Sequence, residues 1–227
     1  MGGNRILSNQ AFFYSAKQRL TSILGESGTI LYSSCETLKP GKYYFLGLNP
    51  GGSEKDTQTI GQSLADLELG RSTNNAYLDQ DWSGFRKYST GGHPLQRNFQ
   101  YLFEKLQEEL ESVCASNLIF TRSIGEKGAG GRERAELCWP VHEAILKIVR
   151  PVAIITFGRQ PFNFIREKLS GTPPEDSRAG HGTWTWRYSI LKTGEKLIGL
   201  PHLSRYALRN HPDVVGNIRK RIGSHAI

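Results

Sequence analysis

The chain has 227 residues, a length that fits one α/β domain with its own core, so we expect residues 1–227 to form a single domain. No apolar run approaches the roughly 18 residues of a membrane span, and we expect a cytoplasmic protein that is a monomer and has no membrane partner. Three cysteines without paired spacing argue against a disulfide framework or a zinc site. The net charge of +8 is typical of proteins that bind nucleic acid, although many basic proteins bind none.

Apolar periodicity divides the first half of the chain into helices and strands. In chain order we expect a helix over residues 5–24, within a helical extension of residues 1–28, then a strand at 29–32, a buried strand from Tyr43, a short helix near 60–69 and a helix over 95–113. Residues 70–94 show no periodicity and carry Tyr77, Trp82 and Phe85. Such a long irregular stretch is typical of a functional loop.

The second half of the chain continues this alternation. We expect strands at 117–120, 152–157, 183–191 and 196–200, a helix that ends before Pro151, a helix that opens at 158–161 and a basic helix from Pro212. This order predicts an α/β fold in which a mainly parallel central sheet lies between two layers of helices. The strand ends at Asn49, Thr121 and His202 should then meet at one edge, where ligands bind in such sheets.

Four segments carry motifs of a known family, in the family's order. They are GLNPG from Gly47, NLIFTRS from Asn117, RPVAIITFGRQPF from Arg150 and LIGLPHLSRY from Leu197. The first resembles the opening motif of the uracil-DNA glycosylase superfamily, in the form found in mismatch-specific and single-strand-selective uracil glycosylases. The others are similar to later motifs of thermostable members, although Leu203 and Arg205 replace two prolines of the closing motif. The resemblance covers most of the chain after residue 40 and implies a three-layer α/β/α sandwich like that of uracil-DNA glycosylase.

The resemblance also implies roles for individual residues. Asn49 would hold the attacking water and His202 would donate to the O2 oxygen of the departing base, so these two are the expected catalytic residues. Such an arrangement suits N-glycosidic hydrolysis, which leaves an electron-poor sugar and an anionic base. Residues expected to bind the base are Gly47, Leu48, Gly51, Gly52, Asn117 and Ser204. Residues expected to bind DNA are Arg205, the wedge residue Tyr206, Arg209, Arg219 and Lys220.

Two departures from the family pattern bear on cofactor and substrate. Thermostable members bind an iron–sulfur cluster through four cysteines, and this chain has three at other positions, so no cofactor and no metal are expected. Strict uracil enzymes carry a tyrosine that blocks 5-substituents, whereas this chain has Gly51, Gly52 and Ser53 there. Thymine or larger 5-substituted pyrimidines would then enter the pocket.

Taken together, the sequence predicts a monofunctional DNA glycosylase. It would hydrolyse the N-glycosidic bond of a flipped-out uracil or modified pyrimidine, leaving an abasic site in DNA repair or antiviral defence. One alternative is a non-catalytic nucleic-acid-binding module of the same fold, and another is an N-glycosidase of free nucleosides or nucleotides. Purely structural roles are also possible for these features. Asn49 could be a turn residue, Trp82 could pack in the core, and the basic helix could be a solvent-exposed face.

Overall fold

The fold is organised around β1 (Tyr43–Gly47), whose residues are all buried. The computed structural model describes residues 3–52, 56–82, 88–124 and 126–223. The other strands are β2 (Cys114–Asn117), β3 (Ala153–Phe157), β4 (Glu175–Arg178), β5 (Thr185–Ile190) and β6 (Lys196–Leu200). The helices are α1 (Gly3–Arg19), α2 (Ile60–Glu68), α3 (Pro94–Lys105), α4 (Gly131–Val149), α5 (Arg159–Lys168) and α6 (Pro212–Gly223).

The sheet has six strands in the order β2-β1-β3-β6-β5-β4. The first four in this order run parallel, and β5 and β4 are added antiparallel at one side. The predicted mainly parallel α/β sheet is therefore confirmed. Because parallel strands end at the same edge, the segments that follow β1, β2, β3 and β6 lie together there.

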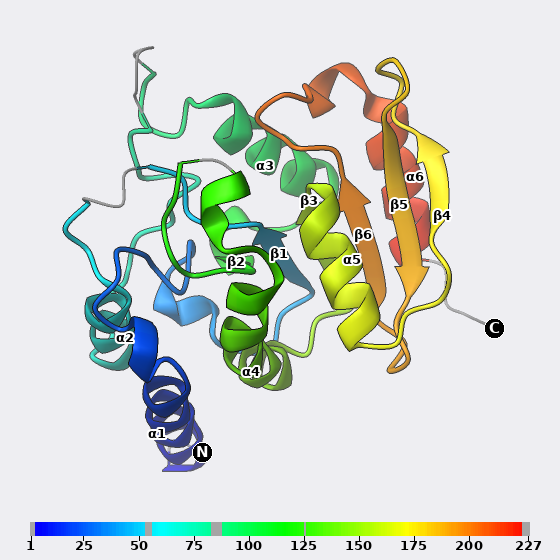
Figure 1. Ribbon diagram of the computed structural model, residues 1–227. Coiled ribbons are helices and arrows are strands. Elements are labelled where there is room, and N and C mark those ends of the chain that lie inside the picture. The colour runs from blue at the N-terminus through cyan, green and yellow to red at the C-terminus, as the bar shows by residue number, and fades with distance from the viewer. Residues whose placement is uncertain (1–2, 53–55, 83–87, 125, 224–227) are drawn as a thin grey trace.

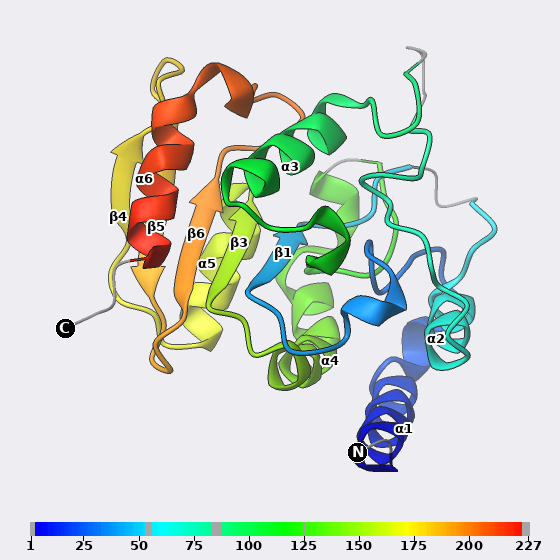
Figure 2. The ribbon, with the colours of Figure 1, turned by 180° about the vertical axis from the view of Figure 1, so that it is seen from behind.

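Helices cover both faces of the sheet, as the two opposite views show (Figures 1 and 2). Tyr44 and Leu46 of β1 belong to one apolar cluster, with buried residues of α1, α2, α4 and α5. Tyr43 and Phe45 belong to a second cluster, with α3 and α6. Successive side chains of a strand point to opposite faces, so one continuous apolar run supplies both cores.

Four expectations for the elements need correction. The second strand is Cys114–Asn117, three residues earlier than predicted, because these residues pair with β1 and the burial that continues beyond them is not strand. The long central helix ends at Lys105, and Gln107 follows it with a left-handed φ of 58°. The predicted strand at 29–32 does not form: within it Leu31 makes an isolated bridge with Ser116, and Gly28, just before it, makes one with Thr121. Strand β4 was missed because its polar sequence has no apolar alternation.

Other features agree with the sequence or extend it. Helix α1 packs against α2 and α4. Cys114 and Cys138 are buried free thiols, and burial raises the pKa of each to about 12. Among the described residues, no helix is long and apolar enough to cross a membrane.

A buried histidine on α4 ties that helix to the sheet. His142 is completely buried, and its Nε2 lies 3.0 Å from the carbonyl oxygen of Leu118. A carbonyl can only accept, so Nε2 carries the proton and Nδ1 accepts from the Tyr44 hydroxyl at 2.8 Å. Burial lowers the pKa of His142 to about 4, so the neutral ring is the folded form near neutral pH.

This histidine should make folding stability depend on pH. An unfolded chain binds a proton at this position below pH 6.5, whereas the folded protein resists it until about pH 4. The free energy of unfolding should therefore fall by about 3 kcal/mol as the pH falls through this window. Urea unfolding of wild type and His142→Gln at several pH values measures this. The variant should be less stable at pH 7 and should lose less stability on acidification; equal slopes would contradict the assignment.

Candidate active site

A cavity of about 1350 Å³ opens at the edge where the parallel strands end. Three polar residues predicted from the sequence line it: Asn49 beyond β1, Asn117 at the end of β2 and His202 beyond β6. The expected convergence of strand ends is confirmed for Asn49 and His202. On the second strand Thr121 does not line the cavity, but Asn117 does, because β2 ends earlier than predicted.

The segment after β2 holds Asn49 in a fixed orientation. The Asn49 Nδ2 donates to the carbonyl oxygen of Pro50 at 2.8 Å and to Ser123 Oγ at 2.9 Å. Since the Pro50 carbonyl can only accept, the amide nitrogen must face it. The amide oxygen then faces away, and among the described residues no side chain or backbone group donates a hydrogen bond to it. It is free to accept a hydrogen bond from a water or a ligand in the cavity.

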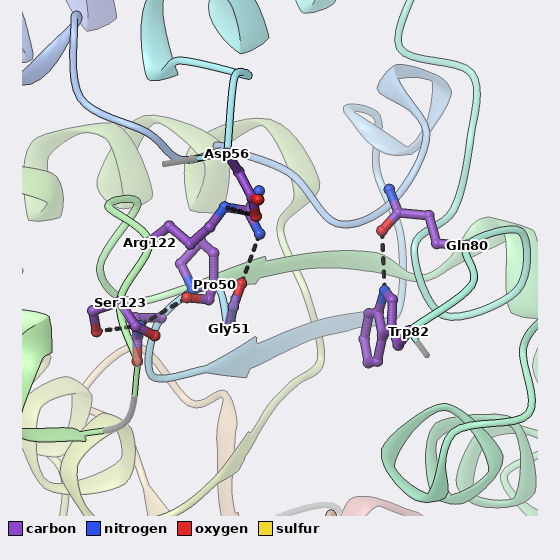
Figure 3. A network of polar contacts seen from close by, with 8 residues as sticks. Pro50, Gly51, Asp56, Gln80, Trp82, Arg122 and Ser123 are labelled. Atoms are coloured by element: carbon purple, nitrogen blue, oxygen red, sulfur yellow. Dashed lines mark hydrogen bonds and ion pairs between the residues drawn. The ribbon is translucent and has the colours of Figure 1, made fainter. Parts of the chain in front are cut away.

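Arg122 closes the same loop from the other side (Figure 3). Its Nη1 donates to the carbonyl oxygen of Gly51 at 2.6 Å, and its Nε lies 3.2 Å from an Asp56 carboxylate oxygen. The Ser123 N–H also donates to the Pro50 carbonyl at 3.2 Å. The Asn49–Gly51 turn is therefore hydrogen-bonded to the Arg122–Ser123 segment through both side chains and backbone. Neither Arg122 nor Ser123 was predicted as a site residue, although both lie in the NLIFTRS segment.

Asn117 carries the clearest sign of a missing partner. Its side chain is 3% exposed, and among the described residues its Nδ2 has no hydrogen-bond partner. A buried polar atom left unpaired costs about 1–3 kcal/mol, so such atoms are rare and point to a ligand or water. A ligand in the cavity that accepts a hydrogen bond would satisfy this amide.

The histidine beyond β6 has a defined tautomer. The Ser204 N–H points to His202 Nδ1 at 3.3 Å, and the Ser204 hydroxyl lies 2.8 Å from the same atom. A backbone N–H can only donate, so Nδ1 accepts and the neutral ring carries its proton on Nε2. The ring packs edge-on against Phe157, with centroids 5.3 Å apart. His202 thus presents an N–H donor, and Ser204 orients it.

Three amide side chains of α3 anchor the loops on both sides of the cavity. Asn98 donates to the carbonyls of Leu203 and Tyr206 and accepts from the Leu208 N–H, so it holds the loop after His202. Gln96 donates to the carbonyls of Ala76 and Gln80, and Gln100 donates to those of Tyr77 and Gly91. The irregular stretch that carries Trp82 is therefore fixed to the same helix. None of these amides was predicted, because they stand between the apolar positions of a helical stripe.

The glycines of the first motif serve different purposes. Leu48, Gly51 and Gly52 line the cavity, as does Ser204, whereas Gly47 does not. A Cβ on Gly47 would lie 2.3 Å from Asn117 Oδ1 and 2.6 Å from Phe157 Cζ, so this glycine allows the close approach of both side chains.

Gly52 is required by the backbone as well as by space. It has a φ of 106°, and a Cβ there would meet the Asp56 carboxylate at 2.9 Å. Gly51 has open space in front of it. A bulky residue at Gly52 would therefore strain the loop, and Gly51 is the position at which added volume enters the cavity. Ser53, the third small residue of this wall, lies outside the described residues.

The wedge role expected of Tyr206 is wrong for this structure. Its side chain is 1% exposed, its hydroxyl donates to the Ala179 carbonyl at 2.5 Å and its ring stacks on His211. The backbone N–H groups of Arg205 and Tyr206 both bond to the His202 carbonyl, and this tight turn directs Tyr206 into the core. Arg205 is exposed and lines the cavity instead.

The basic residues of α6 lie away from the cavity. This helix runs from the cavity edge toward the opposite edge of the sheet (Figures 1 and 2). Arg219 is bonded to Gln107, beyond the C-terminal end of α3, whereas the other end of α3 lines the cavity. Neither Arg219 nor Lys220 lines the cavity, nor does the exposed Arg209. The sequence predicted a single DNA-binding stretch, and the structure divides it.

The described lining of the cavity is net positive. Its charged side chains are Arg122, Arg159, Arg187, Arg205, Asp56 and Asp81. Asp56 is ion-paired with Arg122. The described residues include no group of three or more His, Cys, Asp or Glu side chains that could hold a metal ion.

Comparison with models of known protein families finds no match, and no curated protein is significantly similar to the chain.

Two neighbouring glycines give a matched test of this geometry. Gly47→Ala should lower the free energy of unfolding by about 1–3 kcal/mol, because its Cβ overlaps Asn117 and Phe157. Gly51→Ala should change stability little, because nothing lies within 4 Å of the added atom. Urea unfolding of both variants measures the difference. Equal stability of the two would show that the floor of the cavity yields to an added methyl group.

Proposed function

We propose that the protein is a monofunctional DNA glycosylase that hydrolyses the N-glycosidic bond of a flipped-out uracil or 5-substituted pyrimidine. One observation carries the proposal: an oriented amide, Asn49, an unsatisfied buried amide, Asn117, and an N–H donor, His202, line one cavity although they come from three distant segments. The resemblance to the uracil-DNA glycosylase superfamily selects these same three residues. The fold is compatible with that family's sandwich.

Each residue has a role in this reaction. The Asn49 Oδ1 accepts a hydrogen bond from water and places it near the sugar C1′. Asn117 donates from Nδ2 to an acceptor on the Watson–Crick edge of the base, which satisfies its free nitrogen. The His202 Nε2–H donates to the base O2, where negative charge develops as the bond breaks.

The order of bond changes follows from the groups present. The C1′–N1 bond breaks with its electron pair leaving on the base, and water then adds to the cation-like C1′. The water loses one proton to solvent, and the base anion takes up one. An amide cannot remove a proton from water, so the reaction depends on departure of the base before attack is complete.

The rim of the cavity supplies the DNA contacts in this proposal. Arg159, at the start of α5, and Arg205 are exposed and line the cavity. Positive side chains there would bind the phosphates on either side of a flipped nucleotide. The buried Tyr206 has no part in filling the gap that the nucleotide leaves.

The first test of this mechanism is single-turnover excision. Asn49→Ala and His202→Ala should each slow release of the base roughly 10²- to 10³-fold, because each removes a preorganised partner of the transition state. Duplex and single-stranded oligonucleotides with uracil or a 5-substituted pyrimidine serve as substrates, and alkali cleaves the abasic product. The exposed Asn74 lines no part of the cavity, so Asn74→Ala is the matched control. Full activity of either site variant would refute the mechanism.

The same assay separates the alternatives. A binding module would retain the oligonucleotides without releasing a base. An N-glycosidase of small molecules would cleave nucleosides or nucleotides supplied in place of DNA and leave the oligonucleotides intact.

Salt dependence tests which arginines contact DNA. Each lost phosphate contact lowers the slope of log K against log salt by about 0.9 for duplex DNA. We expect this change for Arg205→Ala and no change for Arg219→Ala combined with Lys220→Ala. The affinity of each protein, carrying Asn49→Ala to prevent turnover, is measured for one duplex at several salt concentrations. A lower slope for Arg219→Ala combined with Lys220→Ala, and an unchanged slope for Arg205→Ala, would show that the basic helix is the DNA-binding surface.

A further inference from the structure

Tyr32 lies on the wall of the cavity, although it belongs to none of the motifs. Its backbone is fixed from two sides: the N–H donates to the Ala115 carbonyl at 2.8 Å, and the carbonyl accepts from the Ala76 N–H at 2.7 Å. The first bond attaches it to β2 and the second to the loop that carries Trp82. Tyr32 is therefore held in place between the sheet edge and that loop.

The two ends of the Tyr32 side chain face different parts of the cavity. The ring packs against Tyr77 and Trp82, with centroid distances of 5.7 and 5.9 Å. The hydroxyl lies close to the amide of Asn117 and to the backbone of Gly51. All five of these residues line one cavity, and the phenol stands between Asn117 and the two aromatic side chains.

The Tyr32 phenol is protonated, so it can both line the cavity wall and donate a hydrogen bond. Burial raises the pKa of Tyr32 to about 12, although Arg122 and Asn117 act in the opposite direction. The hydroxyl is therefore neutral at physiological pH. The hydroxyl lies near Asn117, yet within the described residues Asn117 Nδ2 has no hydrogen-bond partner of normal geometry.

We propose that Tyr32 determines which pyrimidines the site accepts, because it forms the wall beside Gly51 that the small residues of the first motif leave open. This inference rests on the proposed function, since it requires a base bound to Asn117. If a base bound to Asn117 turns its 5-position toward Gly51, a substituent there would meet the phenol. The tyrosine thus limits the size of the substituent, and the space around Trp82 lies beyond it.

Substitutions that change the size of the side chain at Tyr32 test this proposal. Tyr32→Phe keeps the ring and removes the hydroxyl, so it should keep the size limit. Tyr32→Leu and Tyr32→Ala shorten the wall and should raise the ratio of bulky to small bases accepted by about 10-fold or more, the scale at which pockets discriminate added groups. Tyr14→Ala is the control, because Tyr14 is 69% exposed on α1.

Two readouts keep the inference distinct from the proposed function. The first is single-turnover excision of uracil, thymine and 5-hydroxymethyluracil from oligonucleotides. The second is binding of the corresponding free bases, followed by ligand-observed proton NMR. Urea unfolding checks that each variant is folded. If Tyr32→Ala does not fold, Tyr32→Leu provides the shortened wall.

The possible results distinguish the role of Tyr32 from the proposed function. An increased ratio in the shortened variants, with no increase in Tyr32→Phe or Tyr14→Ala, supports the inference. Excision by wild type with an unchanged ratio in Tyr32→Leu overturns the role of Tyr32 and leaves the proposed function standing. Binding of free bases with the increased ratio but without excision by any protein supports Tyr32 and overturns the glycosylase. Absence of both excision and binding overturns both.

Discussion

The candidate site depends on amide side chains of α3 that hold loop backbone in place. Loops carry carbonyl and N–H groups that no neighbouring strand satisfies, and burial without partners would be costly. Asn98 satisfies three such groups around the His202 turn, and Gln96 satisfies two in the loop of Trp82. Both walls of the cavity are thus attached to one helix, which packs on the sheet through Phe99 and Phe103. A rigid helix fixes the separation between two otherwise irregular segments.

The floor of the cavity is set by close packing at the sheet edge. Gly47 ends β1 without a side chain, and this allows Asn117 and Phe157 to approach from the strands on either side. Phe157 in turn contacts His202. The geometry of the amide and that of the imidazole are therefore linked through one aromatic ring. Moving either strand end would disturb both polar groups together.

Apolar periodicity predicted the fold well and the site in part. The runs at Tyr43 and Ala153 are long and fully buried, so the sequence specified β1 and β3 without tertiary information. The bounds of β2 could not be read, since burial extends unbroken past Asn117 and only pairing with β1 ends the strand. The positions of Tyr206 and Tyr32 could not be predicted from the sequence either. Hydrogen bonds to distant backbone place Tyr32 on the cavity wall and Tyr206 in the core, and no local sequence pattern reports these bonds.

The charges of the cavity constrain any hydrolytic chemistry within it. Of the two carboxylates in the described lining, Asp56 is held by Arg122, and Asp81 precedes Trp82 in the loop anchored by α3. The turn that carries Asn49 offers an amide oxygen, which can orient water but cannot take its proton. In the proposed reaction, a site with these groups would gain most of its rate from stabilising the departing base, and His202 would be the donor that does so. Its specificity would then depend on two separate properties of the base. One would be how well N1 bears negative charge as the bond breaks, and the other would be the shape of the base, which Asn117 and the cavity wall would select.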